Sequence, residues 1–176
     1  MNALANYIGT TIQAVALLRE HGLPSHALVQ IYAAIDTAGL LADDSKDRAS
    51  SKTFCAWVDQ YLIKQDGINF TSIDLWSARC AVLHTFTTSS DLSRAGEARE
   101  LVYYQDSGKG KLDAFKEFTA TFQNGRYIAV DLNALELALL RAFQEFYTLV
   151  ASRPVTNKMA ERMKQVLQQH EPEAAP

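Results

Sequence analysis

Arg79 and His84 are the residues of this 176-residue chain whose types and spacing most directly suggest chemistry. They enclose four residues in the run RCAVLH. Arginine offers a permanent cation with a planar set of donors that fits a phosphate, and histidine can give or take a proton near neutral pH. These are the two side chains that a metal-independent ribonuclease needs. The chain has nine arginines and four histidines, so the spacing alone could arise by chance.

Arg79 and His84 would not share one face of a helix. Successive helical residues are about 100° apart, so these two positions differ by about 140° around the axis. A catalytic site would therefore need a cleft along one edge of the helix or a residue from a second subunit, which favours a homodimer. The alternative is structural: Arg79 would form an ion pair with Asp36 or Asp74, and His84 would stabilise the C-terminus of its helix, where a cation is favourable.

The segment from Ser72 to Phe86 must carry both residues, and its pattern predicts a helix. Thr71 or Ser72 can cap its N-terminus, and Asp74 in the first turn suits the helix dipole. The polar run from Thr87 to Asp91 competes with helical hydrogen bonds and predicts the end of the helix. The residues expected to be buried are Leu75, Trp76, Val82, Leu83 and Phe86.

Apolar residues at helical spacing predict further helices on both sides of this segment. A stop signal at His21-Gly22 ends the first one, and Ser25 is the expected N-cap of the second. The expected helices cover about residues 8–21, 25–41, 51–63, 131–152 and 157–169, the fourth capped by Asp131 or Asn133. The polar stretch 42–51 is expected to be a solvated connection between helices. The sequence contains no internal repeat.

Two short runs are rich in strand-forming residues: 101–104 (LVYY) and 127–130 (YIAV). Between them, Leu112, Phe115 and Phe118 suggest a short helix. The chain is therefore predicted to be mainly α and to form one domain, residues 1–170, with a small two-stranded β-ribbon insertion at about 99–130. Residues 171–176 are expected to form a disordered tail.

The composition limits the classes of function. A formal net charge of −3 gives no global attraction to nucleic acid or anionic membranes, so a phosphate site would need a local basic patch or one assembled between subunits. Cys55 and Cys80 lie in apolar patterns without a C-x-x-C spacing, which predicts buried free thiols in a reducing, cytoplasmic compartment. No stretch approaches about 18 uncharged apolar residues, so no membrane association is expected.

The segment DLWSARCAVLHTF (74–86), together with the pattern HALVQIYAAID (26–36), resembles the HEPN superfamily (higher eukaryotes and prokaryotes nucleotide-binding). The likeness covers about residues 8–90 and the helix from Asn133 to Ser152. The resemblance implies an up-and-down helical bundle that forms a homodimer. In such dimers the motif arginines and histidines of both subunits line a cleft and cleave RNA without a metal ion, often in toxin, phage-defence or RNA-processing settings.

On this resemblance, Arg79 would hold the scissile phosphate and His84 would act in proton transfer, with the ribose 2′-hydroxyl as nucleophile. Asp36, one residue after a core position of its helix, could orient Arg79 or tune His84, and Asp74 is a second possible support. Many active members carry a polar residue directly after the motif arginine, where this chain has Cys80. The alternative function is a non-catalytic helical interaction or regulatory module with a vestigial motif and a protein partner.

A possible RNA-binding set follows the motif helix. Arg94, Arg99, Tyr103 and Tyr104 place cations and aromatic faces near one another, the combination that holds single-stranded RNA. The alternative is an ordinary loop followed by a core strand. No metal or cofactor is expected, because the chain has no H-E-x-x-H pattern or His/Cys cluster, and the run GKGK (108–111) lacks the frame of a phosphate-binding loop.

Overall fold

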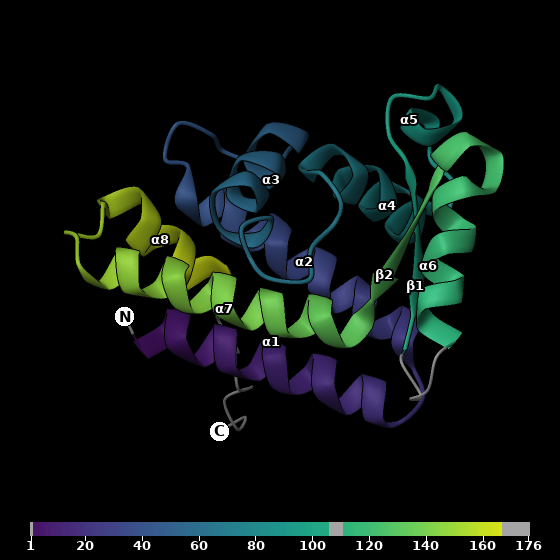
Figure 1. Ribbon diagram of the computed structural model, residues 1–176. Helices are drawn as coiled ribbons and strands as arrows, with labels where there is room; N and C mark the ends of the chain where they lie inside the picture. The colour runs from purple at the N-terminus through teal and green to yellow at the C-terminus, as the bar shows by residue number, and fades with distance from the viewer. Residues whose placement is uncertain (1, 106–110, 167–176) are drawn as a thin grey trace, which may run out of the picture.

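The computed structural model describes residues 2–105 and 111–166 and is mainly helical, with one two-stranded parallel sheet in this part of the chain (Figure 1). The elements in chain order are α1 (Asn2–Glu20), α2 (Pro24–Ala42), α3 (Ser51–Trp57), the π-helical turn η1 (Val58–Leu62), α4 (Ser72–Thr85), α5 (Asp91–Arg94), β1 (Glu100–Tyr104), α6 (Lys111–Thr121), the 3-10 turn η2 (Phe122–Gly125), β2 (Tyr127–Asp131), α7 (Leu132–Ala151) and α8 (Asn157–Val166). The predicted mainly α class with two short strands is confirmed.

The expected tail, the end of the last predicted helix (167–169) and residues 108–110 lie outside the described residues. None of the helices among the described residues is long and apolar enough to cross a membrane.

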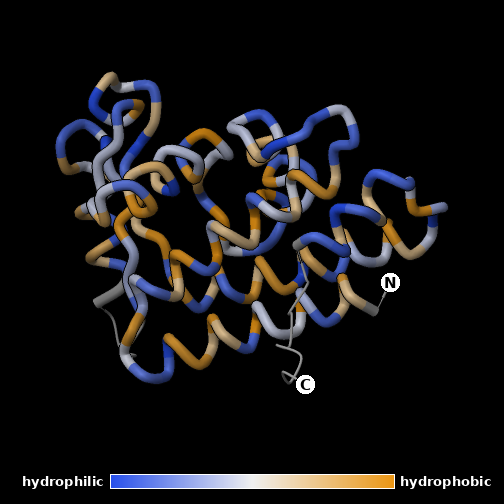
Figure 2. Tube along the Cα trace, turned by 180° about the vertical axis from the view of Figure 1, so that it is seen from behind, coloured by the Kyte–Doolittle hydropathy of each residue, from blue (hydrophilic) through white to orange (hydrophobic). Residues whose placement is uncertain are grey.

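Helix α2 lies at the centre of the helical part of the molecule. It packs against α1, α3, α4 and α8, while α7 runs alongside α1 (Figure 1). One broad stripe of α2 is buried because its apolar residues recur at helical spacing; it comprises Leu28, Ile31, Tyr32, Ile35 and Ala38. Hydrophobic and hydrophilic residues alternate along the helices in the view from behind, as expected when each helix turns one side to a shared core (Figure 2).

The close approach of α2 and α3 depends on Gly39. A Cβ atom at this position would lie 2.5 Å from the backbone oxygen of Thr53 and 2.9 Å from its carbonyl carbon. Thr53 is itself fixed, because it forms a capping box with Ser50 at the start of α3. Glycine is therefore required for the two helix backbones to touch.

The two strands pair in parallel, with Glu100 opposite Tyr127 and Tyr104 opposite Asp131. Parallel neighbours need a crossover connection, which α6 and η2 provide. The resulting unit stands at one end of the helices (Figure 1). The predicted ribbon bridged by a helix is confirmed. Of the two predicted caps of α7, Asp131 is the one that caps it: its Oδ1 accepts a hydrogen bond of 2.8 Å from the backbone N–H of Asn133.

Local capping chemistry sets several helix starts. Of the two predicted caps of α4, Thr71 is the one that caps it, and Asp74 accepts a hydrogen bond from the Thr71 backbone, which completes a capping box. The prediction that Ser25 caps α2 is wrong. Leu23 occupies the N-cap and Pro24 starts the helix, because the fixed φ of proline suits the first helical turn. The loop expected after α4 contains one short helix, α5.

Helix α4 buries a narrower apolar set than predicted. Leu75 is buried, but Trp76, Val82 and Leu83 are only partly buried. Phe86, expected in the core, is 56% exposed. It lies beyond the last helical residue in the left-handed conformation, with φ of 55°, so it no longer follows the helical period. The buried side consists largely of small residues instead: Ser77, Ala78 and Ala81.

Replacing Gly39 with alanine should destabilise the fold. Alanine normally stabilises a helix relative to glycine by about 1 kcal/mol. At Gly39 the added methyl group would overlap the Thr53 backbone, so we expect a net loss of about 1–3 kcal/mol in the free energy of unfolding. Gly9→Ala in α1 is the matched control, because its Cβ would meet no atom within 4 Å; it should gain about 0.5–1 kcal/mol. Urea denaturation measures the free energy of unfolding of both variants. Equal stability of the two would contradict the close contact of Gly39 with the Thr53 backbone.

Candidate functional site

Arg79 is held in place by two neighbours. Its Nε and Nη2 atoms donate hydrogen bonds of 3.0 and 2.7 Å to the same carboxylate oxygen of Asp36 on α2. Its guanidinium also lies over the Trp76 ring, 4.9 Å from the ring centroid, which is a cation–π contact. Both side chains of the ion pair are largely buried, with 19% of Arg79 and 14% of Asp36 exposed. Of the two predicted ion-pair partners, Asp36 is the one that contacts Arg79.

Asp36 lies between α1 and α4. Its second oxygen, Oδ1, is buried and has no hydrogen-bond partner within the part of the chain that the structure describes. The phenol of Tyr7 lies on the α1 side. Burial raises the pKa of Tyr7, and the charge of Asp36 raises it further, whereas hydrogen bonds with Thr37 and Thr11 lower it. A guanidinium has five N–H donors, so the two bonds to Asp36 leave others for an anion. The pair can therefore present a positioned cation beside the contact of α2 and α4.

His84 is exposed in the last turn of α4, where a cation interacts favourably with the helix C-terminus. It is about 140° from Arg79 around the helix axis and about 7.5 Å further along it. Between these two edges, α4 carries three partly buried residues that we call the α4 strip: Trp76, Cys80 and Leu83. Arg79 and His84 flank the strip on opposite sides, so they do not face each other within one chain.

The two cysteines are free, as predicted, but they are only partly buried, because they lie at the margins of the core on α3 and α4. Burial raises the pKa of the Cys55 and Cys80 thiols. They are therefore protonated near neutral pH and are weak nucleophiles. Cys80 serves as a small apolar residue of the α4 strip beside Arg79.

Asp74 supports the start of α4 rather than Arg79. Its carboxylate accepts hydrogen bonds from the backbone N–H groups of Thr71 (2.9 Å) and Arg99 (2.7 Å) and from the Arg99 guanidinium (2.7 Å). Burial opposes ionisation of this carboxyl, but the bonds from Arg99 and Thr71 outweigh burial and hold the pKa of Asp74 below its ordinary value. Asp74 is thus ionised at neutral pH and ties α4 to the segment that leads into β1.

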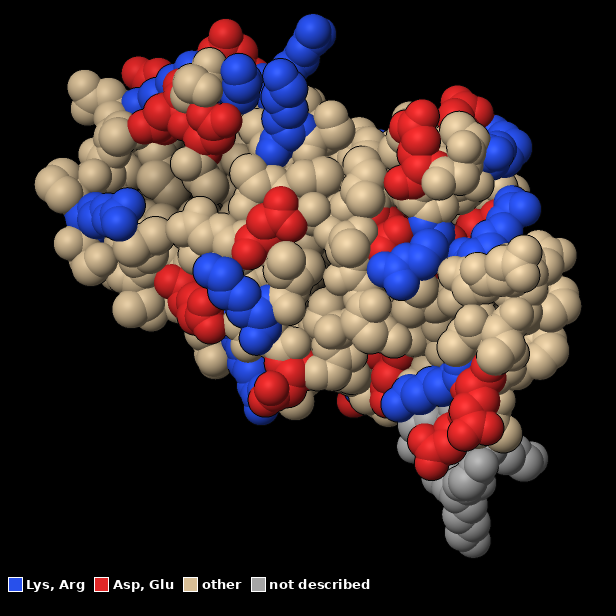
Figure 3. Space-filling model, turned by 45° about the horizontal axis from the view of Figure 1, so that its top comes forward, with Lys and Arg blue, Asp and Glu red and all other residues tan. Residues whose placement is uncertain are grey.

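The four residues of the predicted RNA-binding set line two different hollows. Arg94 and Arg99 line an open one of about 690 Å³, together with Arg126. Each of these arginines has an acidic partner: Asp91, Asp74 and Glu100, respectively. Tyr103 and Tyr104 lie at a second, smaller cavity. Acidic and basic side chains also lie beside each other over the face seen in Figure 3, so neither sign of charge dominates that face.

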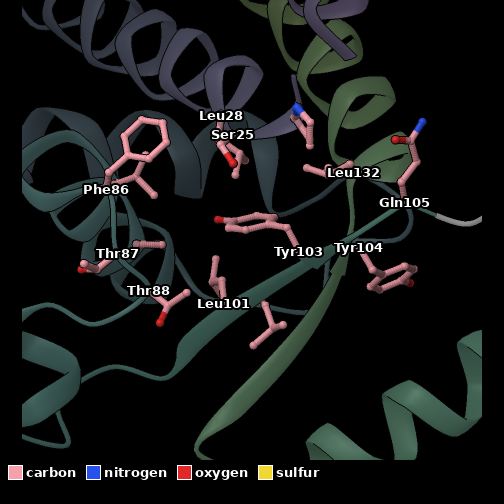
Figure 4. Close-up of a pocket in the computed structure, with 14 residues that line it drawn as sticks. Ser25, Leu28, Phe86, Thr87, Thr88, Leu101, Tyr103, Tyr104, Gln105 and Leu132 are labelled. Atoms are coloured by element: carbon pink, nitrogen blue, oxygen red, sulfur yellow. The ribbon is translucent and has the colours of Figure 1, made fainter. Parts of the chain in front are cut away.

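The smaller cavity, which sequence patterns did not predict, has a volume of about 310 Å³. It lies between the start of α2, the end of α4 and β1 (Figure 4). Successive side chains of a strand point to opposite sides, so Tyr103 faces the cavity whereas the Tyr104 ring packs against Phe115 of α6, 5.5 Å away. Tyr103 also forms a hydrogen bond with the buried hydroxyl of Tyr32 on α2. Further lining residues are Ser25, Leu28, Val82, Phe86, Thr88 and Leu101.

Within residues 2–105 and 111–166, no group of three or more His, Cys, Asp or Glu side chains gathers in a way that could hold a metal ion. Comparison of the chain with protein-family models, curated proteins and solved structures gives no match. Membership of the HEPN superfamily therefore stays a prediction that rests on the motif residues of α2 and α4.

A double-mutant cycle should show that Asp36 and Arg79 are coupled. Each single change to alanine leaves a largely buried charged partner, so we expect each to cost about 1–3 kcal/mol, with a coupling energy of about 1–2 kcal/mol. The control is the exposed pair of Arg141 and Asp66, 3.6 Å apart, whose coupling should stay below about 0.5 kcal/mol. Denaturant unfolding of the seven proteins, with the wild type common to both cycles, provides the free energies of unfolding. Equal coupling in the two cycles would show that the Asp36 contact does not fix Arg79.

Proposed function

We propose that this chain is a HEPN-like endoribonuclease that acts without a metal ion as a homodimer, with Arg79 binding the scissile phosphate and His84 transferring a proton. The observation that supports this best is the position of Arg79, a guanidinium fixed by Asp36 and Trp76 at the edge of an apolar strip. A cation fixed in this way can bind a phosphate with little further loss of side-chain entropy. His84 is exposed on the same helix, where a substrate can reach it.

The proposed reaction transfers the phosphoryl group to the neighbouring ribose hydroxyl. His84 removes the proton of the 2′-hydroxyl, and the 2′-oxygen attacks phosphorus. Arg79 stabilises the negative charge that develops on the non-bridging oxygens. The bond from phosphorus to the 5′-oxygen breaks, that oxygen takes a proton from water, and the proton held by His84 then neutralises the hydroxide that remains. The products are a 2′,3′-cyclic phosphate and a 5′-hydroxyl.

Two copies of the chain are proposed because of the geometry of α4. Arg79 and His84 lie on opposite edges of the α4 strip, so they cannot both face one phosphate from a single chain without a large rearrangement. A second copy packed on the strip would cover Trp76, Cys80 and Leu83. A two-fold axis can place the Arg79 edge of one strip against the His84 edge of the other strip. In this arrangement Arg79 of one subunit lies beside the partner's His84. Each dimer then contains two equivalent centres.

The second candidate is a non-catalytic helical interaction module. The same ion pair favours it, because Asp36 already neutralises Arg79 and a structural arginine needs no further partner. The apolar Cys80 directly after the motif arginine points the same way. In this case a partner protein, rather than a second copy, would cover the α4 strip.

Cleavage of a mixed single-stranded RNA pool in excess chelator separates the two functions. We expect wild-type protein to cleave the pool, and Arg79→Ala and His84→Ala each to lower the rate at least about 100-fold, since each loses one element of transition-state stabilisation. The matched controls are Arg141→Ala and His21→Ala, exposed residues away from α4, which should retain the wild-type rate. Circular dichroism and light scattering confirm the fold and mass of every protein.

Wild-type protein that is folded and dimeric but leaves every RNA of the pool intact would favour the interaction module. Cleavage by Arg79→Ala and His84→Ala at the rate of wild type and of the control variants would assign the activity to a contaminating nuclease.

A further inference from the structure

Four residues of α2 connect the Arg79 ion pair with the cavity between α2, α4 and β1. Ser25, Leu28, Tyr32 and Asp36 follow one another at spacings of three and four, so they lie on one side of the helix. Ser25 and Leu28 line the cavity. Tyr32 forms a hydrogen bond with Tyr103 in the cavity wall, and Asp36 holds Arg79. Leu28 and Asp36 are about 12 Å apart along the axis. An RNA strand with a phosphate on Arg79 would therefore have a nearby base within reach of the cavity.

The lining of the cavity suits a flat ring with a polar edge. Its volume of about 310 Å³ is at the lower end of the range for small-molecule pockets, which is the size for one ring system. Leu28, Val82 and Leu101 make its walls apolar. Ser25 and Thr88 are exposed at its margin, and each hydroxyl can both donate and accept a hydrogen bond. Unpaired nucleobases are bound in this way, through apolar or aromatic faces and polar groups on their edges.

Phe86 marks the mouth of the cavity. Its backbone is left-handed, with φ of 55°, at a position after a helix that glycine or asparagine usually occupies. A bulky residue in this conformation is strained, yet its ring is 56% exposed and contributes little to the core. The ring lies 5.6 Å from that of His26, and in Figure 4 Tyr103 extends from β1 toward Phe86. An exposed aromatic ring held at a strained backbone position is available for stacking on a base.

Tyr103 in the wall, with Tyr32 buried behind it, has a hydrogen-bond donor to offer. Burial raises the pKa of both Tyr32 and Tyr103, so both phenols are protonated at neutral pH. They share one hydrogen bond, which uses one of the two hydroxyl protons. When Tyr32 donates in this bond, the Tyr103 proton can be donated to a carbonyl oxygen or ring nitrogen at the edge of a bound base.

We propose that this cavity binds one unpaired nucleobase of the RNA, next to the phosphate on Arg79, and so determines the base preference of cleavage. Phe86 stacks on the base, and Tyr103, Ser25 and Thr88 bind its polar edge. This inference rests on the proposed ribonuclease function, but binding of a nucleobase by the cavity can be measured without cleavage.

Two variants alter the cavity while keeping the fold. Phe86→Asn removes the stacking ring, and asparagine tolerates the left-handed backbone. Val82→Phe fills the cavity from a partly buried position. The matched control is Val150→Phe, the same change at a partly buried position in a different hollow, between α7 and α8.

The first measurement is calorimetric binding of the four nucleoside 5′-monophosphates to wild type and the three variants. We expect wild type to bind one of them at least about tenfold more tightly than the weakest, and Phe86→Asn and Val82→Phe to weaken that binding at least about tenfold, whereas Val150→Phe leaves it unchanged. The second measurement is sequencing of the cleavage ends from the RNA pool. Wild type and Val150→Phe should share one base preference, which the two cavity variants lose.

The two proposals fail in different ways. Cleavage that depends on Arg79 and His84 but shows the same base preference in Val82→Phe and Phe86→Asn would overturn the base-binding cavity and leave the ribonuclease standing. Nucleotide binding that the cavity variants abolish, in a protein that cleaves no RNA, would support the cavity as a site for a free nucleotide and overturn the ribonuclease. Equal binding of all four nucleotides by wild type and every variant would overturn the cavity proposal.

Discussion

The ion pair between Asp36 and Arg79 is the interaction on which the candidate site depends, because it fixes α4 against α2 and gives the motif arginine its direction. It can do so only if α2 itself is held firmly. Gly39 lets the α2 backbone touch α3. At the same end of α2, Arg162 of α8 donates hydrogen bonds of 2.6 and 2.9 Å to the carbonyl oxygens of Leu40 and Asp43, which lack helical partners. The position of Arg79 thus rests on helices from both ends of the chain.

A positioned arginine suits a protein without a strong overall charge. The formal net charge of −3 does not attract RNA, and the arginines of the open hollow near β1 are paired with acids. Binding would therefore depend on a few well-placed groups rather than on a broad basic surface. The α4 strip separates the cation from the proton-transfer group within one chain, and this separation is the reason to propose that the site forms between two chains. The cavity beside Phe86 would add base recognition to that site.

Features set by neighbouring residues were predictable from the sequence, whereas features set by contacts between distant residues were not. Thr71 and Asp74 form a capping box three residues apart, so the start of α4 could be inferred locally. Asp36 and Arg79 are 43 residues apart, and the sequence offered Asp74 as an equal partner. The exposure of Phe86 follows from the backbone conformation after the helix ends. The cavity forms where two helix ends meet a strand, an arrangement that leaves no periodic pattern; the alternation of Leu101 and Tyr103 along β1 was its one local signal.

The most direct test of a site shared between two chains is subunit mixing. Arg79→Ala and His84→Ala proteins are mixed, allowed to exchange subunits, and assayed on RNA in excess chelator, with native mass spectrometry to confirm mixed dimers. A mixed dimer contains one complete centre if Arg79 and His84 act from different subunits, so an equal mixture should recover about one quarter of the wild-type rate. Mixed dimers that are no more active than either variant alone, beside an active wild type, would contradict the shared site.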